Sequence, residues 1–155
     1  MSQDGTGVDL ETSLGYLLKE ASSALRTAME AVLRPLGMTV THYSCLELLA
    51  QRPGLSNSEL ARGTFVTRQS MNVLLQALER DGFVTRPAEA RVGKALPAQL
   101  TPRGRRSLEK ASAAVRSVEV RMLGGMSQQE QAEAFRLLRG MVDSLRSAEG
   151  DATRG

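Results

Sequence analysis

Two helix starts lie close together near the middle of the chain, and their spacing limits the possible folds more than any other feature. Ser56 and Glu59 match a capping box, in which the serine accepts a backbone N–H and the glutamate bonds back to the cap. Gly63 ends this short helix, and Thr67 begins another after residues 64–66 alone. Two helices joined so tightly must cross at a steep angle, so the sequence predicts a helix–turn–helix.

The helix predicted over 67–80 has one apolar face and one polar face. Met71, Leu74, Leu75 and Leu78 recur at three- and four-residue steps, which is the spacing of a buried stripe. The opposite face is predicted to be exposed, hydrogen-bonding and not acidic, and it carries Arg68, Gln69, Asn72 and Gln76.

A β-hairpin is predicted after this helix. Residues 83–86 favour a strand and 96–101 favour its partner, which Pro97 confines to a sheet edge because proline donates no ladder hydrogen bond. The loop between them carries two cations, Arg91 and Lys94, near a glycine. We expect this loop to project as a basic finger.

Amphipathic helices are predicted before the helix–turn–helix. The first runs from Leu14 and ends where Pro35 breaks the hydrogen-bond ladder, and a shorter one is capped by Thr39 or Thr41. Aromatic residues make up only 3% of the chain, so the core must consist mainly of Leu, Val, Met and Ala. That composition favours helices over a β-sandwich.

Two long helices are predicted after the hairpin, one starting at Thr101-Pro102 and one at a capping box formed by Ser127 and Glu130. Their apolar residues follow three- and four-residue steps that suit pairing across a twofold axis in a homodimer, although packing within one chain is the alternative. These residues are Leu108, Ala111, Val115, Val118 and Met122, then Phe135, Leu138, Val142 and Leu145.

These elements predict a mainly α fold with a small β-hairpin wing, and the 155 residues suffice for a single domain. We expect the winged helix–turn–helix to occupy 38–101, and dimerisation helices to occupy 10–36 and 102–147. The polar, glycine-containing ends, 1–9 and 148–155, are expected to fray.

Four short motifs, in this order, resemble the MarR family of bacterial transcriptional regulators. They are LSNSELA at 55–61, VTRQSMN at 66–72, LERDGFV at 78–84 and LTPRG at 100–104. The resemblance extends over about residues 10–147 and implies a homodimeric, DNA-binding regulator, with repression the expected sense. The chain departs from the family at the wing, where the family's Asp-Arg-Arg falls on Val92, Gly93 and Lys94.

The polar face of the helix over 67–80 suits the major groove of DNA, which is about 12 Å wide and admits one helix. Arg can bond guanine, and Asn or Gln adenine, through paired hydrogen bonds, while hydroxyls at the helix start suit phosphates. In a homodimer, two such helices about 34 Å apart would face successive grooves of a pseudo-palindromic operator. The predicted DNA-contacting residues are Thr64, Thr67, Arg68, Gln69, Ser70, Asn72, Gln76, Arg86, Arg91 and Lys94.

The placement of charge favours a polyanionic partner. Although the net charge is only +3, residues 52–110 contain eleven basic and five acidic side chains. Two alternatives remain open, a merely solvated arginine-rich surface and a winged-helix module that binds an acidic protein. Arg103, Arg105 and Arg106 are interpreted as surface residues rather than phosphate contacts.

Signals for catalysis, metal binding and membrane insertion are absent from the sequence. His42 and Cys45 are single, and neither a serine elbow, a phosphate-binding glycine loop nor a zinc-ligand spacing occurs, so no enzyme, cofactor or metal is expected. Both residues suit structural roles, but the resemblance also allows them to line a pocket for a small-molecule effector. No signal peptide or apolar run of about 18 residues occurs, so we expect a cytoplasmic protein without a membrane partner.

Overall fold

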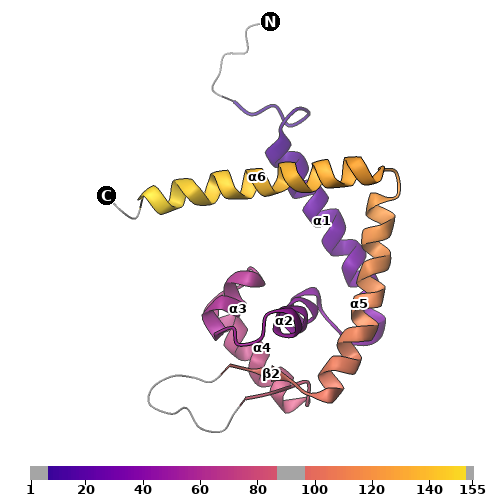
Figure 1. Cartoon of the computed structure of the whole chain (residues 1–155), viewed down its shortest axis with the longest axis vertical. Helices are drawn as coiled ribbons and strands as arrows, with labels where there is room; N and C mark the ends of the chain where they lie inside the picture. The colour runs from indigo at the N-terminus through magenta and orange to yellow at the C-terminus, as the bar shows by residue number, and fades with distance from the viewer. Residues whose placement is uncertain (1–6, 87–96, 153–155) are drawn as a thin grey trace, which may run out of the picture. The chain divides into compact units, whose positions relative to one another are not determined.

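The computed structural model describes residues 7–86 and 97–152, so the expected basic loop with Arg91 and Lys94 falls outside it. The chain forms two compact units, divided between Val118 and Glu119. In chain order (Figure 1), the elements are α1 (Leu14–Leu33), the 3-10 helix η1 (Arg34–Leu36), α2 (Val40–Gln51), α3 (Asn57–Gly63), α4 (Arg68–Arg80), β1 (Val84–Thr85), β2 (Gln99–Leu100), α5 (Pro102–Leu123) and α6 (Gln128–Ala152).

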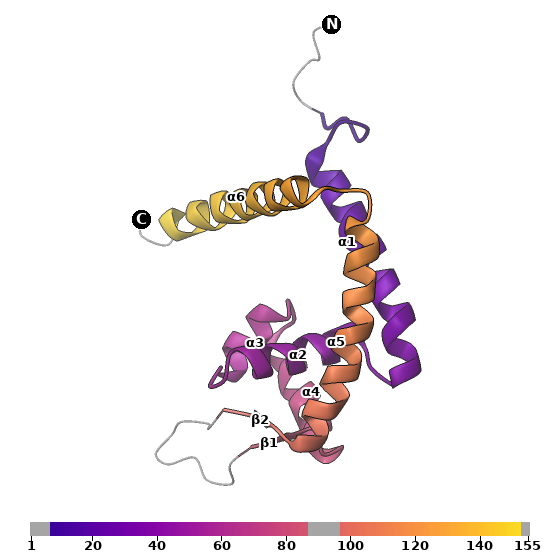
Figure 2. The same ribbon diagram turned by 45° about the vertical axis from the view of Figure 1, so that its right-hand side comes forward.

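The predicted fold class, mainly α with a small β-hairpin, is confirmed. β1 and β2 form a two-stranded antiparallel sheet in which Val84 pairs with Leu100 (Figure 2). Both strands are shorter than predicted, and at their inner end Phe83 links the hairpin to α4. Its N–H bonds back to the Leu78 carbonyl at the end of α4, and its carbonyl accepts from the Thr101 N–H.

The predicted helix starts are confirmed by side-chain caps. Thr39, rather than Thr41, caps α2, and Thr67 caps α4 by accepting from the Ser70 N–H at 3.1 Å. The capping box at α3 is complete, and hydrogen bonds from Ser56 hold the pKa of Glu59 below its ordinary value. Each cap satisfies backbone donors that helix geometry leaves unpaired.

A single apolar core holds the first unit together. The predicted stripe of α4 is confirmed, because Met71, Leu75 and Leu78 are buried and Leu74 packs against the core. Leu46 of α2 and Leu60 of α3 are likewise fully buried. Burying one such side chain contributes about 1.5–3 kcal/mol, so this face of α4 is fixed inward and its polar face must point outward.

The LTPRG motif joins α5 to the hairpin. The Thr101 hydroxyl donates to the Gly82 carbonyl at 2.6 Å and accepts from the Gly104 N–H at 3.0 Å, so this side chain links the α4–β1 turn to the first turn of α5. A Cβ at Gly104 would lie 2.1 Å from the Phe83 carbonyl oxygen. The motif therefore needs threonine for its hydroxyl and glycine for close backbone approach.

Part of the apolar stripe of α5 packs within the protomer, the alternative that the sequence left open. Leu108, Ala111 and Val118 are buried within the protomer, where Leu108 and Ala111 belong to the same core as α4. This part of the stripe therefore does not offer a surface to a second copy. Only the far end of α5 exposes large apolar side chains, with Val120 65% and Met122 52% accessible.

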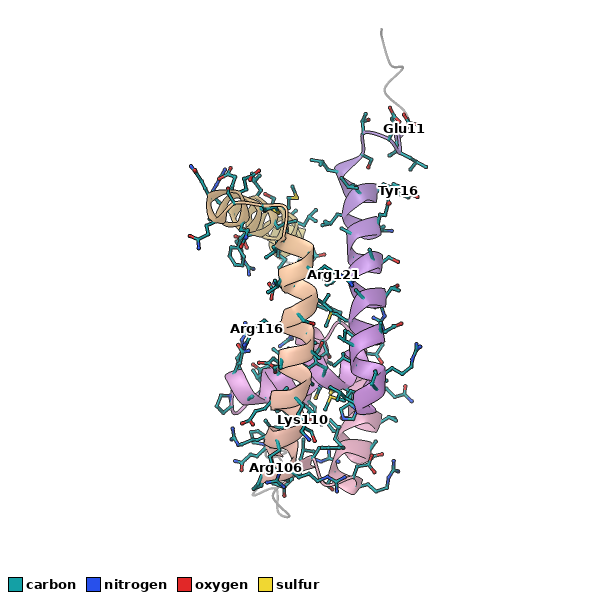
Figure 3. All side chains as sticks on the ribbon, turned by 90° about the vertical axis from the view of Figure 1, so that its right-hand side faces the viewer. Glu11, Tyr16, Arg106, Lys110, Arg116 and Arg121 are labelled. Carbon is teal, nitrogen blue, oxygen red and sulfur yellow. The ribbon has the colours of Figure 1, made fainter. Side chains whose placement is uncertain are left out.

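Helices α1 and α6 expose much of their apolar surface. Tyr16, labelled in Figure 3, is exposed on α1, as are Leu14, Leu17 and Leu18. On α6 the exposed apolar residues are Phe135, Leu137, Leu138, Met141 and Leu145. The expectation that 148–155 fray is wrong for its first residues, because α6 continues to Ala152. No helix in 7–86 or 97–152 is long and apolar enough to cross a membrane.

Candidate nucleic-acid interface

The turn between α3 and α4 is held by backbone hydrogen bonds. The Thr64 N–H bonds to the Leu60 carbonyl at 3.0 Å, and the Val66 N–H bonds to the Ala61 carbonyl at 3.0 Å. Phe65 between them adopts φ +60°, in the left-handed region. The turn brings the first turn of α4 beside α3 (Figure 1).

The four polar residues predicted to share the outer face of α4 are all exposed there: Arg68, Gln69, Asn72 and Gln76. Two of these side chains are bonded to α3. Arg68 Nε donates to Ser58 Oγ at 2.8 Å, and Asn57 Nδ2 donates to Asn72 Oδ1 at 2.8 Å. The remaining guanidinium donors of Arg68 and the amide donors of Asn72 are available for an external acceptor.

Asn57 and Ser58 bond to two of the candidate site residues, and sequence reasoning missed them. Both belong to the first turn of α3, beside the capping box. A pattern that counts only exposed side chains along α4 does not detect them, because they act across the turn. One sequence feature could have pointed to them. The two helix starts are close along the sequence, which brings the first turn of α3 against α4.

The Thr67 hydroxyl caps α4, whereas the Ser70 hydroxyl can still donate to a group outside the protein. Thr67 Oγ1 accepts from the Ser70 N–H and donates to Ser70 Oγ at 2.9 Å. The Thr67 proton is thus committed within the helix, whereas the Ser70 hydroxyl keeps its own proton for another acceptor. Both residues are exposed at the start of α4.

The predicted phosphate contact at Thr64 is wrong for its side chain. Thr64 is only 7% exposed, and its hydroxyl donates to the Leu60 carbonyl at 2.7 Å. The Leu60 carbonyl also accepts from the Thr64 N–H, so the hydroxyl adds a second bond to the same oxygen, and this local bond holds the side chain inward.

Arg86 is fixed to the end of α4. Its Nε donates to Glu79 Oε2 at 3.1 Å, and its side chain is 28% exposed. This ion pair therefore occupies the Nε–H of the guanidinium. Arg86 therefore ties the start of the hairpin to α4. The other wing cations expected at the DNA, Arg91 and Lys94, lie outside the described residues.

His42 and Cys45 lie on α2 in different surroundings. Cys45 is fully buried with its Sγ 3.8 Å from Met71 Sδ, and burial raises the pKa of its thiol to about 12. His42 packs edge-on against Phe83 with ring centroids 5.5 Å apart, and its Nε2 is buried without a hydrogen-bond partner among the described residues. Burial lowers the pKa of His42 below 6.5, and the Asp81 charge opposes this effect only in part.

A pocket of about 360 Å³ lies elsewhere in the first unit. An ion pair between Arg26 and Glu30, with an N–O distance of 3.2 Å, forms part of its wall. Its lining residues are Arg26, Glu30, Arg34, Gly37, Met38, Thr39 and Val40. Neither His42 nor Cys45 lines it, and Cys45 has no solvent-accessible surface with which to touch an effector.

The basic start of α5 adds positive charge beside the hairpin. The guanidinium of Arg103 lies over the Phe83 ring, 5.1 Å from its centroid, while Arg106 and Lys110 are exposed further along the helix (Figure 3). Within the described ranges, no three His, Cys, Asp or Glu side chains are grouped as metal ligands.

Comparison with protein families and curated proteins agrees with this geometry. A family model described as "MarR family" matches residues 36–95. The "HTH-type transcriptional repressor Rv2887" of Mycobacterium tuberculosis is 44% identical over 132 residues, which cover 85% of this chain and 95% of that protein.

Solved structures show the same relationship. Rv2887 in complex with DNA superimposes with a TM-score of 0.68 at 40% identity, covering 84% of this chain and 98% of that one. Rv2887 in complex with salicylic acid gives a TM-score of 0.70 at 44% identity, covering 84% and 96%. A MarR family regulator from Silicibacter pomeroyi, only 22% identical, shares the fold with a TM-score of 0.79 over 92% of this chain and 96% of its own.

Proposed function

This chain belongs to the MarR family of transcriptional regulators, and from that premise we propose that it is a homodimeric repressor that binds a specific site in double-stranded DNA. One observation carries the proposal. The outer face of α4 presents Arg68 and Asn72, each bonded to a side chain of α3, beside Gln69 and Gln76. These are the side-chain types that read guanine and adenine edges in the major groove.

The hydrogen bonds to α3 give these side chains a defined direction before DNA binds. Arg68 and Asn72 are exposed, and a free exposed arginine loses rotamer freedom when it is immobilised at an interface. Ser58 and Asn57 restrict that freedom in the unbound protein. We therefore assign base recognition to Arg68 and Asn72, and assign positioning to Ser58 and Asn57.

The rest of the predicted contact surface takes supporting roles in this proposal. Ser70 and the backbone N–H groups at the start of α4 bind phosphate, while Gln69 and Gln76 face the groove. Arg86 holds the hairpin against α4, and Arg91 and Lys94 are assigned to the minor groove as expectations from sequence alone.

A second copy of this chain is the proposed partner of the exposed apolar residues on α1 and α6. Contiguous apolar side chains such as Phe135, Leu138 and Leu145 on α6 are unusual on the surface of a monomer. A twofold dimer would cover them and place two α4 helices about 34 Å apart, one helical turn of DNA.

Because Rv2887 forms complexes with DNA and with salicylic acid, we propose that an aromatic carboxylic acid regulates this chain too. The pocket between α1 and α2 suits such a ligand, since Arg34 provides a cation beside the apolar Met38 and Val40. Salicylate should raise the Tm and weaken DNA binding, and Arg34→Ala should abolish both effects while Arg116→Ala leaves them. If both variants respond like the wild type, this pocket is not the effector site.

The proposed role is non-enzymatic, and we place the protein in the cytoplasm, because a repressor must reach the chromosome.

The alternative function, a winged-helix module that binds an acidic protein, predicts no preference among DNA sequences. Binding of the purified protein to DNA from upstream of its own gene, compared with a scrambled duplex of equal length over a salt series, separates the two. Selective binding that weakens steeply with salt supports the repressor, and equal weak binding to both duplexes argues against it for that DNA.

A further inference from the structure

The turn between α3 and α4 exposes an aromatic ring on a strained backbone. Phe65 has φ +60°, and its side chain is 85% exposed. It is the sole non-glycine residue with positive φ within 7–86 and 97–152, where Gly37, Gly54 and Gly82 occupy the other left-handed positions. An L side chain is disfavoured in this conformation, whereas glycine adopts it freely.

Folding does not require a ring at this position. The turn depends on backbone groups, because the Phe65 N–H bonds to the Arg62 carbonyl at 3.3 Å and the Val66 N–H bonds to Ala61. Glycine would provide the same bonds without strain. A side chain that is 85% exposed also contributes little burial to the core. Strain without a folding benefit is a feature of residues kept for function.

Phe65 stands beside the residues assigned to DNA recognition. It lies two residues before Thr67, the cap of α4, and three before Arg68. In helix–turn–helix proteins the first residues of the recognition helix contact base edges in the major groove while the first helix crosses the DNA backbone, so we expect the turn that joins them to lie near the edge of that groove. Deoxyribose carbons and the thymine methyl group are apolar surfaces that a phenyl ring can cover there.

We propose that Phe65 is a DNA-contacting residue whose ring packs on apolar atoms of the sugar–base edge next to the bases that Arg68 reads. The inference rests on the proposed function, and it adds a contact without charge to an interface otherwise made of polar and basic groups. The ring strengthens binding through burial of apolar surface and releases no counterion.

The test compares Phe65→Gly, Phe65→Ala and Phe65→Tyr with the wild-type dimer. The probe is a duplex enriched by the wild type from a random-sequence pool. Phe65→Gly and Phe65→Ala should weaken binding about tenfold, while Phe65→Tyr keeps the ring and should bind within about twofold of wild type. The slope of log K against log salt should stay unchanged, because no phosphate contact is lost.

Stability supplies the second readout. Phe65→Gly should keep or raise the Tm, by up to about 4 °C, because it relieves the left-handed strain. Val8→Ala is the matched control, since Val8 is another exposed apolar side chain of the first unit, 75% accessible, outside the segments assigned to dimerisation and to DNA. It should leave DNA binding unchanged.

Three results would overturn the proposal. Wild-type affinity in Phe65→Gly would show that the ring does not touch DNA, and a large fall in Tm would show that the ring serves the fold. A change in oligomeric state, measured by light scattering, would assign the ring to a second copy of the chain. If the wild type enriches no sequence at all, the proposed repressor function fails as well, which distinguishes that failure from the failure of the Phe65 contact alone.

Discussion

Arg68 Nε donates a hydrogen bond to Ser58 Oγ at 2.8 Å, and this bond crosses the turn from the recognition helix α4 to α3. The bond uses the inner edge of the guanidinium and leaves its terminal N–H groups for an acceptor outside the protein. The first turn of α3 thereby determines the direction of a side chain assigned to base recognition.

Ser58→Ala should weaken binding to the enriched duplex by about three- to tenfold, because Arg68 must then be ordered when DNA binds. The Tm should change little, since the lost bond is exposed and its partners become hydrated. Ser117→Ala, which removes an exposed hydroxyl bonded within its own helix α5, is the control and should bind like the wild type. Equal affinities for Ser58→Ala and the wild type would contradict the positioning role.

Gly104→Ala should destabilise the protein by about 3 kcal/mol or more, because the added Cβ would lie 2.1 Å from the Phe83 carbonyl and force α5 away from the hairpin. Chemical denaturation measures this change. Gly15→Ala provides the control, since its Cβ would meet only Ser13 Oγ at 3.8 Å and should stabilise α1 by about 0.5 kcal/mol. Similar stabilities for the two variants would refute the close approach.

Because His42 is partly buried, we expect the folded protein to lose stability in mild acid. Burial lowers its pKa in the folded state below 6.5, so as the pH falls below that value the unfolded chain binds more protons than the folded chain. The contribution of neutral His42 to the free energy of unfolding is complete above about pH 6.5. It declines as the pH falls toward the folded-state pKa of His42, by at most about 1.4 kcal/mol per pH unit.

His42→Phe isolates this effect, because phenylalanine keeps an aromatic ring beside Phe83 and removes the unpaired Nε2. The free energy of unfolding should depend less on pH between 7.5 and 5.5 in this variant than in the wild type. Parallel profiles for the two proteins would show that His42 is not responsible.

Leu138→Glu and Leu145→Glu should shift the protein toward monomer, because each places a charge on the exposed apolar face of α6. Ser117→Glu adds the same charge at an exposed site on α5 and should leave the dimer intact. Analytical ultracentrifugation measures the change. An unaltered dimer in both leucine variants would place the dimer interface outside this face.

Local sequence signals were sufficient to predict where the helices start and which face of α4 is polar. Caps such as Thr67 and Ser127 act within one turn, so their effect can be inferred from neighbouring residues alone. The outward placement of Arg68 and Asn72 followed from the three- and four-residue spacing of the apolar residues of α4.

Features that depend on contacts between elements were not predictable in this way. The three- and four-residue spacing of Leu108, Ala111 and Val118 is the same whether a protomer's own core or a second chain covers the helix. Thr64 is buried because its hydroxyl bonds back to the Leu60 carbonyl at the end of α3, where the chain turns toward α4. The bond from Arg68 to Ser58 joins two helices across a turn, which a pattern along one helix does not contain.

The central claim, that α4 reads bases through Arg68, is tested most directly by measuring affinities for the enriched duplex and all its single-base variants. Arg68→Ala should cost about 1–3 kcal/mol on the preferred duplex and lose discrimination at one base pair in each half-site. Arg116→Ala, at an exposed position on α5 (Figure 3), should keep the wild-type preferences. Equal losses across all sequences for Arg68→Ala, with preferences unchanged, would contradict base recognition by this residue.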